Sequence, residues 1–234
     1  MIRGFYSAGS GLSAFQKGVD NVANNLANVN TTAYKKQSVR FSDLLTSNLA
    51  SPAGEEPQDL KVGNGVRASG TVALMSQGAP VQTGQALDFA LICEGFFGVA
   101  DADGNLMYTR DGNFHISSEA DGNYLVNGMG EYVIGQDGEK ILVDEKFSQD
   151  KIAVFNFDNP YGLSIIGNNR YEATDYSGEA FAVEGVLAQG YLENSNTDIT
   201  VEISELISLQ KAYQFNAKMI QTADEIENII NNLR

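Results

Sequence analysis

SGLSAFQKGVDNVANNLANVNTTAY, residues 10–34, is the stretch that decides the fold of this chain. Its apolar residues recur at alternating intervals of three and four, the spacing of a helix that buries one seam against a partner helix. They are Leu12, Phe15, Val19, Val22, Leu26 and Val29. Ser10 stands just before this seam and is a residue type that caps helices, so we expect the helix to begin there.

A second helical pattern occupies the far end of the chain, from Ile199 to Leu233. Its residues near heptad positions are Leu206, Leu209, Tyr213, Ile220, Ala223, Ile230 and Leu233. Residues 1–40 hold five Lys or Arg and one Asp, a net charge of +4. Residues 193–234 hold three Lys or Arg and seven Asp or Glu, a net charge of −4. Opposite charge favours pairing of the two ends. The alternative is two ordinary amphipathic helices on one globular core, and periodicity alone does not decide between them.

Between the helices the pattern is that of β-structure. Short apolar or β-branched runs between Gly63 and Tyr191 are separated by Gly-containing turn pairs. The predicted strands are Thr71–Met75, Phe89–Ile92, Phe96–Ala100, Tyr124–Val126, Tyr132–Ile134 and Ile152–Phe157. The predicted turns are Asp103-Gly104, Asp111-Gly112, Asp121-Gly122, Asp137-Gly138 and Ser177-Gly178. This spacing indicates an antiparallel sandwich or irregular barrel.

The predicted fold class is therefore α+β, with paired, coiled-coil-like N- and C-terminal helices and an inserted, mainly antiparallel β-domain. We expect a terminal helical domain from residues 1–34 and 196–234, an extended arm at 35–69, and the β-domain at 70–195. Residues 51–59, SPAGEEPQD, hold two of the four prolines and predict an exposed loop within the arm.

Composition excludes several classes of function. The net charge of −15 argues against a nucleic-acid partner, because no basic patch is available to replace counterions on phosphates. Cys93 is the one cysteine, so neither an intramolecular disulfide nor a multi-cysteine metal site is expected. No apolar run approaches the ~20 residues of a membrane span, and the N-terminus lacks the pattern of a signal peptide. Composition alone indicates a cytoplasmic protein.

Catalytic, cofactor and metal signatures are also missing from the sequence. His115 is the one histidine and lies in a predicted strand, where a structural role is the simpler interpretation. Asp101–Asn105 resembles the start of a calcium loop, but its glycine is fourth rather than sixth and Gly112 stands where the Glu ligand belongs. We expect no catalytic residue, no bound cofactor and no metal.

Three sets of motifs carry a resemblance to a known family. The run ANNLANVNT at 23–31, followed by Tyr34-Lys35, is similar to the N-terminal signature of the flagellar rod and hook proteins. GYLENSN at 190–196, followed by Glu205-Leu206-Ile207 and QKAY at 210–213, resembles their C-terminal signature. TGQALD at 83–88, Gly95-Phe96-Phe97 and YTRDGNF at 108–114 resemble the single β-domain of the distal rod members.

The resemblance implies a structural subunit of the flagellar basal-body rod. Such a subunit would polymerise into a hollow helical drive shaft around the export channel, contacting copies of itself, neighbouring rod and hook proteins and the flagellar type III export apparatus. It would lie outside the cytoplasmic membrane, in the periplasm or cell wall, exported without a cleaved signal peptide. Two rivals stay open: a rod-like paralogue acting in assembly, as a proximal rod or hook-type adaptor, and a hydrolase built on the β-domain.

The residues expected at the assembly interface come from both terminal helices. They are Leu12, Phe15, Val19, Val22, Asn24, Asn25, Leu26, Asn28, Val29, Leu206, Leu209, Tyr213, Ile220, Ile230 and Leu233. The three asparagines within five residues lower helix propensity. We therefore expect some of their amides to hydrogen-bond across helices in the assembled tube and fix the register, as buried polar residues do in coiled coils.

Overall fold

A computed structural model of the chain describes residues 3–48, 61–119, 122–143 and 151–233. The chain forms two compact units. The helical unit consists of Met1–Ala27, Gln37–Val72 and Asp198–Arg234, and the β-unit of Asn28–Lys36 and Ala73–Thr197. The chain thus passes from one unit to the other at four points. The predicted loop at 51–59 and Asp121 of one predicted turn lie outside the described residues.

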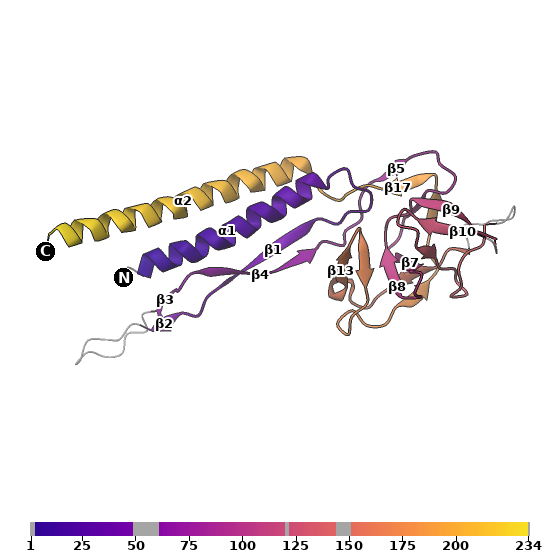
Figure 1. Cartoon of the computed structure of the whole chain (residues 1–234), viewed down its shortest axis with the longest axis horizontal. Coiled ribbons are helices and arrows are strands. Elements are labelled where there is room, and N and C mark those ends of the chain that lie inside the picture. Colours follow the sequence, from indigo (N-terminus) through magenta and orange to yellow (C-terminus); the bar gives the residue numbers. More distant parts are fainter. Residues whose placement is uncertain (1–2, 49–60, 120–121, 144–150, 234) are drawn as a thin grey trace. The chain divides into compact units, whose positions relative to one another are not determined.

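The helical unit is built on two helices, α1 (Arg3–Ala27) and α2 (Ile199–Asn232), which lie side by side and run in opposite directions (Figure 1). Asp198 caps α2, because its Oδ1 accepts hydrogen bonds from the backbone N–H groups of Thr200 and Val201. The prediction that Ser10 caps α1 is wrong, since the helix already runs from Arg3. The Ser10 hydroxyl instead donates to the Ser7 carbonyl (2.8 Å) within the helix.

An extended arm completes the helical unit. Strand β1 (Gln37–Asp43) pairs with β4 (Val66–Ala73), and the short β2 (Ser47–Asn48) pairs antiparallel with β3 (Lys61–Val62). The β1–β4 ribbon runs along α1 (Figure 1). The rings of Phe15 on α1 and Phe41 on β1 lie 5.9 Å apart, and the Val66 N–H donates to the Ser10 hydroxyl. The arm is therefore packed on the helix rather than free.

In the described part of the chain, nine strands form the main sheet of the β-unit, with spatial order β13-β14-β8-β7-β11-β10-β9 and with β12 pairing both β7 and β15. The strand pairs of this sheet are antiparallel in the described part of the chain. The strands are β7 (Phe96–Ala100), β8 (Leu106–Thr109), β9 (Phe114–Glu119), β10 (Gly122–Asn127), β11 (Tyr132–Val133), β12 (Val154–Asn156), β13 (Ser164–Gly167), β14 (Arg170–Glu172) and β15 (Phe181–Val183). The α+β prediction with an antiparallel β-domain is confirmed.

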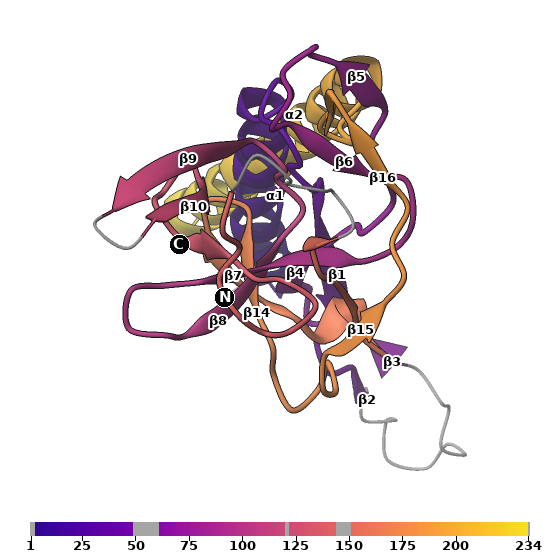
Figure 2. The same cartoon turned by 90° about the vertical axis from the view of Figure 1, so that its right-hand side faces the viewer.

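Two smaller strand pairs link the segment before the main sheet with the segment that leads to α2. Strand β6 (Phe89–Leu91) pairs antiparallel with β16 (Leu187–Gln189), and the two lie side by side in Figure 2. Strand β5 (Pro80–Gln82) pairs with β17 (Tyr191–Glu193). The six predicted strands each overlap an observed strand, and the largest difference is at the predicted Thr71–Met75, where β4 begins earlier, at Val66, and ends at Ala73.

Strand β7 lies at the centre of the β-unit's core, because all five of its residues are buried. Phe97 and Val99 point into a cluster with Phe89, Phe114 and Leu125, whereas Phe96 points the other way. Phe96 packs in a second, aromatic cluster against Phe157 and Tyr171 at ring separations of 5.8 and 5.4 Å. A strand buried on both faces has no reason to alternate with polar residues, which explains the continuous apolar run FFGVA.

Two of the predicted Asp-Gly turns have the backbone that the prediction requires, with φ of +84° at Gly104 and +78° at Gly138. Gly112 is different, since its φ is not in the left-handed region. A Cβ atom at this position would lie 1.7 Å from the carbonyl oxygen of Phe89, whose N–H donates to the Gly112 carbonyl (3.0 Å). Gly112 is thus required by a close backbone approach, and the predicted hairpin role is wrong.

Gly112→Ala is expected to destabilise the β-unit by roughly 3 kcal/mol or more, the upper end of the cost of overpacking a core, because backbone must move to admit the methyl group. Denaturant unfolding followed by tyrosine fluorescence measures the change. Gly128→Ala is the matched control, since a Cβ there meets nothing within 4 Å, and it should change stability by less than about 0.5 kcal/mol. Equal stability of the two variants would contradict the close approach.

Candidate assembly interface

The face of α1 that packs on α2 is a line of small residues. Gly11, Ala14, Gly18, Val22 and Asn25 are all buried. A Cβ atom on Gly18 would lie 3.2 Å from Leu209 of α2, and one on Gly11 would lie 3.1 Å from the Asn216 amide oxygen. The two backbones approach closely because these positions carry little or no side chain.

The helix register follows from three contacts. Asn25 meets Glu202, Gly18 meets Leu209 and Gly11 meets Asn216. Each step of seven residues back along α1 therefore matches a step of seven forward along α2, which is the heptad register of an antiparallel pair.

Asn25 joins three elements of the helical unit. Its amide nitrogen donates to the Gln37 carbonyl (2.8 Å) and to the Glu202 carboxylate of α2 (3.1 Å). Its amide oxygen accepts the Gln37 N–H (3.0 Å). Asn25 and Glu202 are 1 % and 0 % exposed. Within the single chain, Asn25 thus bonds across the helix pair to a buried carboxylate and also pairs with the backbone at the start of β1. The predicted asparagine hydrogen bonds between subunits of the assembled tube stay a prediction.

The structure places the residues predicted for the assembly interface in three groups. Val22 and Asn25 are buried. The half-buried group is Leu12, Phe15, Val19, Leu26, Asn28, Val29, Leu206, Leu209, Tyr213 and Ile220. The exposed group is Asn24, Ile230 and Leu233.

Helix α2 carries two heptad seams. The inner seam, which includes the residues facing α1, follows 4-3-4-3-4-3 spacing over residues 202–223, where every member is buried or half-buried: Glu202, Leu206, Leu209, Tyr213, Asn216, Ile220 and Ala223. The same spacing continues to Glu227 and Ile230, which are exposed. The outer seam follows 4-3-4-3-4 spacing: Phe215, Met219, Thr222, Ile226, Ile229 and Leu233. Its five apolar members are 70, 57, 49, 59 and 82 % exposed.

The sequence offset between the inner and outer seams determines the angle between them around the helix axis. Where the two overlap, each outer-seam residue stands one position before an inner-seam residue, so the seams lie about 100° apart around the helix. One partner helix cannot cover both. Within the described residues, α1 covers the inner seam over residues 202–223, and the five apolar residues of the outer seam are exposed.

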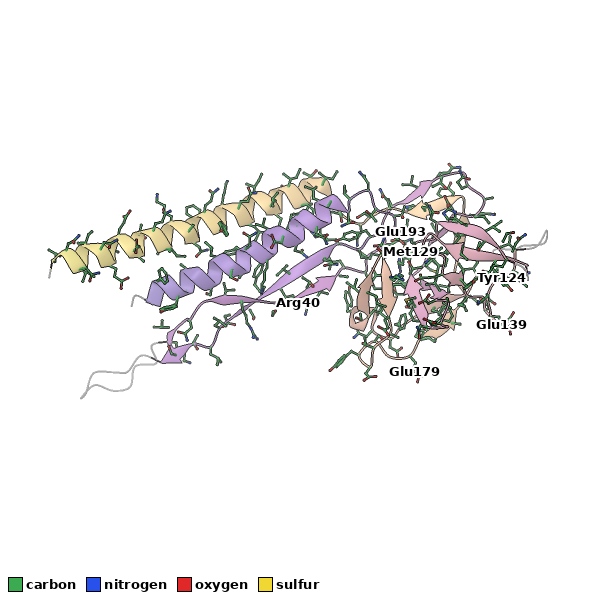
Figure 3. The ribbon with its side chains drawn as sticks, in the orientation of Figure 1. Arg40, Tyr124, Met129, Glu139, Glu179 and Glu193 are labelled. Atoms are coloured by element: carbon green, nitrogen blue, oxygen red, sulfur yellow. The ribbon has the colours of Figure 1, made fainter. Side chains whose placement is uncertain are left out.

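A second buried polar group lies in the β-unit and joins all three family motifs. Glu193 accepts from the Lys35 ammonium (2.5 Å), the Gly78 N–H (2.8 Å) and the Arg110 guanidinium (3.3 Å). The side chains of Lys35, Arg110 and Glu193 are 1, 3 and 1 % exposed, and we call these three residues the ion cluster. Figure 3 labels Glu193. The Arg110 guanidinium also lies over the Phe96 ring, 5.3 Å from its centroid.

Burial sets the proton affinities around the ion cluster. Burial lowers the pKa of Lys35, opposed by the Glu193 carboxylate and reinforced by the Arg110 cation. Burial also raises the pKa of the Tyr171 hydroxyl well above its ordinary value. Nearby, burial raises the pKa of Asp111, against the hydrogen bonds that its carboxylate accepts from the Asn113 N–H and the Thr32 hydroxyl.

Lys35, Arg110 and Glu193 lie within the sequence motifs, but their part in a buried ion cluster was not predicted. A feature of the sequence that could have indicated a buried charge is a charged residue next to apolar or aromatic neighbours, as in Tyr191-Leu192-Glu193. Such a signal marks a buried charge but does not identify its partner. Among the described residues, no group of three His, Cys, Asp or Glu side chains is arranged to hold a metal ion.

Comparison with known proteins identifies the family. Residues 5–35 match the flagella basal body rod protein model, residues 90–154 the flagellar hook protein FlgE/F/G D1 domain, and residues 188–233 the flagellar basal body rod FlgEFG protein C-terminal model. The flagellar basal-body rod protein FlgG of Borreliella burgdorferi is 37 % identical, over 100 % of this chain and 99 % of the relative. The chain belongs to the flagellar basal-body rod protein family. It is a structural rod subunit of the distal rod type, located in the flagellar basal body.

Two relatives from one organism show how far the similarity extends. FlgG of Bacillus subtilis is 36 % identical, over the full length of both chains. The flagellar hook-basal body complex protein FlhP of the same organism is 28 % identical, again over both full lengths. No helix among the described residues has the length and apolar character needed to cross a membrane.

Asn25→Ala is expected to destabilise the helical unit by about 2–4 kcal/mol, because it removes the amide that serves Gln37 and leaves the buried Glu202 carboxylate short of a donor. Urea unfolding followed by circular dichroism at 222 nm measures the loss. Asn24→Ala, at the exposed neighbouring position, should not lower stability by a comparable amount, because alanine has the higher helix propensity. Equal effects of the two substitutions would contradict the role of Asn25.

Asp111→Asn is expected to flatten the pH dependence of stability. The folded pKa of Asp111 is raised, so this carboxyl contributes stability below its unfolded pKa and that contribution is lost as pH rises through the folded pKa. Relative to the Asn variant, the wild type should therefore lose stability from about pH 4 upward. Unfolding midpoints between pH 3 and 7 check this, with Asp103→Asn, at an exposed turn, as the control for net charge. Parallel curves for wild type and Asp111→Asn would contradict it.

Proposed function

We propose that this chain polymerises into the hollow helical shaft of the rod, with its terminal helices forming an inner tubular layer and the β-unit an outer one. The observation that carries the proposal is the exposed outer seam of α2. A helix with two seams about 100° apart needs two partners, and α1 of the same chain supplies one of them. The second partner is then a neighbouring copy.

Such a contact is heterologous, because the outer seam of one copy meets a different surface on the next. Heterologous contacts that do not close on themselves generate a helix of subunits. A shaft built in this way transmits torque, since each subunit is held by several neighbours.

The outer seam is large enough to drive this association. Complete burial of one Phe, Met, Ile or Leu side chain stabilises by about 1.5–3 kcal/mol, and the five such side chains of the outer seam are 49–82 % exposed. Part of that gain offsets the cost of association. The inner seam, with Glu202 and Asn216, is the more polar of the two and sets register instead.

We infer further that the subunit lies outside the cytoplasmic membrane, assembles with other rod and hook proteins, and leaves the cell interior through the flagellar type III export channel. The support is the family to which the chain belongs. A chain with Cys93 as its single cysteine can form no intramolecular disulfide, which suits passage in an unfolded state.

A second candidate is an assembly role in the hook-basal body complex, distinct from the distal shaft. The full-length similarity to FlhP, named as a hook-basal body complex protein, favours it. Deletion separates the two. Loss of the distal shaft would leave a short rod that lacks its outer segment, whereas loss of an adaptor would leave that segment in place.

Phe215→Ser with Met219→Ser is expected to raise the critical concentration for polymerisation at least tenfold, the equivalent of about 1.4 kcal/mol of lost contact energy. Sedimentation of polymer and electron microscopy of the tubes measure the effect. Circular dichroism should match the wild type, since both side chains are exposed in the single chain. Gln214→Ser with Lys218→Ser, also exposed and just off the seam, is the control. Unchanged polymerisation of the seam variant would overturn the proposed role of α2.

A further inference from the structure

The main sheet of the β-unit ends at β9, and this edge is open in the described part of the chain. Strand β9 (Phe114–Glu119) pairs with β10 over six consecutive residues and is the last strand in the order of the sheet. Figure 2 shows it at the margin of the β-unit, with β10 beside it. The isolated bridge between Asp88 and Asn113 lies just before the strand.

The hydrogen bonds of β10 show which backbone groups of β9 face outward. The Leu125 N–H donates to the Ile141 carbonyl (3.0 Å). The Asn123 carbonyl accepts from the Val143 N–H (2.8 Å). Leu125 and Asn123 therefore turn their backbone groups away from β9 and form non-hydrogen-bonded pairs with the residues opposite them, which are Ile116 and Ser118. The N–H and C=O groups of those two residues consequently point to the open side of the sheet.

The core of the β-unit also stops at this edge. Ile116 lies directly opposite Leu125, so the two side chains share one face of the sheet. Leu125 is 0 % exposed and belongs to the core, whereas Ile116 is 48 % exposed. An apolar side chain on one further strand would cover Ile116 and continue that core.

The sequence of β9 lacks the features that usually block an edge strand against pairing, which are lysine, proline, a bulge or a cover. The strand reads FHISSE, and its register with β10 has no bulge. Its one acidic residue is Glu119, at the end of the strand, where the carboxylate accepts from the Tyr132 hydroxyl. At the other end of the sheet, β13 is four residues long and its register is interrupted between Ile165 and Gly167. Of these two edges, β9 is the one suited to pairing.

Charge and size point to another copy of this chain as the occupant. Residues 73–197 hold five Lys or Arg and nineteen Asp or Glu, so two β-units repel each other over most of their surface. Residues 114–118 carry no carboxylate, so two acidic units can touch there.

The size of the edge favours a neighbour that is already held nearby. The outward groups of two residues and one apolar side chain fall far short of the ~1,000 Å² that a stable complex needs. A separate protein would not be retained by this contact alone. A neighbouring subunit of the shaft presents its segment at high effective concentration, so a small contact is enough.

We propose that β9 is a docking edge between subunits. An extended segment from the β-unit of a neighbouring copy adds to β9 as a further strand, with main-chain hydrogen bonds to Ile116 and Ser118 and an apolar side chain over Ile116. The inference rests on the proposed function, because the shaft brings the neighbour into place. It deepens that function by adding a contact between β-units to the contact between helices.

Hydrogen exchange of the full chain, measured on free subunits and on polymer, tests the docking edge. The amides of Ile116 and Ser118 should exchange at least about tenfold more slowly in the polymer, because they gain hydrogen-bond acceptors there. The amides of His115 and Ser117 face β10 and are the internal reference, protected in both states. Mass spectrometry with fragmentation of the peptide that covers residues 114–119 separates the four amides.

Ile116→Lys is expected to raise the critical concentration for polymerisation about tenfold or more, because strand addition would bury an unpaired ammonium group. Ile166→Lys on β13 is the matched control, since Ile166 is 45 % exposed and receives the same charge. The control should stay within about twofold of the wild type. Protection of the Ser117 amide shows that each variant is folded.

A wild-type polymer in which the Ile116 and Ser118 amides exchange as fast as in the free subunit overturns the docking edge and leaves the proposed shaft intact. Equal critical concentrations of the two lysine variants also overturn the docking edge. A wild-type chain that forms no polymer overturns both proposals, because the edge would then have no occupant.

Discussion

The cost of burying the Glu193 carboxylate is the constraint on which the rest of this structure depends. A carboxylate at 2 % exposure is tolerated only when cations and donors surround it. Its cations, Lys35 and Arg110, lie 158 and 83 residues away in sequence, so the β-unit must bring three distant segments together before the charge is satisfied. Those segments are the ones that carry the family's three motifs. The ion cluster thereby accounts for one charged residue in each set of motifs: Lys35, Arg110 and Glu193.

The helical unit solves a different physical problem. Helix α1 packs on α2 through a line of small residues, which allows the two backbones to approach closely. The larger apolar side chains of α1 lie on either side of that line and are half-buried. That packing buries the inner seam of α2 and leaves the outer seam exposed. A single chain therefore leaves part of its apolar surface, the outer seam of α2, exposed to solvent. In the proposed shaft, a neighbouring copy would cover this exposed seam.

Much of the fold was predictable because it rests on local patterns. Heptad spacing identifies both terminal helices, and apolar runs between Gly-containing turns identify the strands around Phe96–Ala100. Local patterns fail where a contact is long-range. Ser10 has the chemistry of a cap but lies inside α1, where it receives the Val66 N–H of the arm. Gly112 has the sequence of a turn glycine but is required by the approach of Phe89.

The sequence by itself determined the family, the two-helix and β-strand composition, the acidic charge and the heptad seams, because each is a property of neighbouring residues. The tertiary structure alone decided which side of each helix is buried. Periodicity sets the spacing of a seam but not which face of the helix turns toward the partner. In α1, the face that packs on α2 is the one with the small residues, one position before the predicted apolar seam, because they permit the closest backbone approach. The tertiary structure also decided the partners of Asn25 and Glu193, since no local pattern encodes hydrogen bonds across 177 or 158 residues.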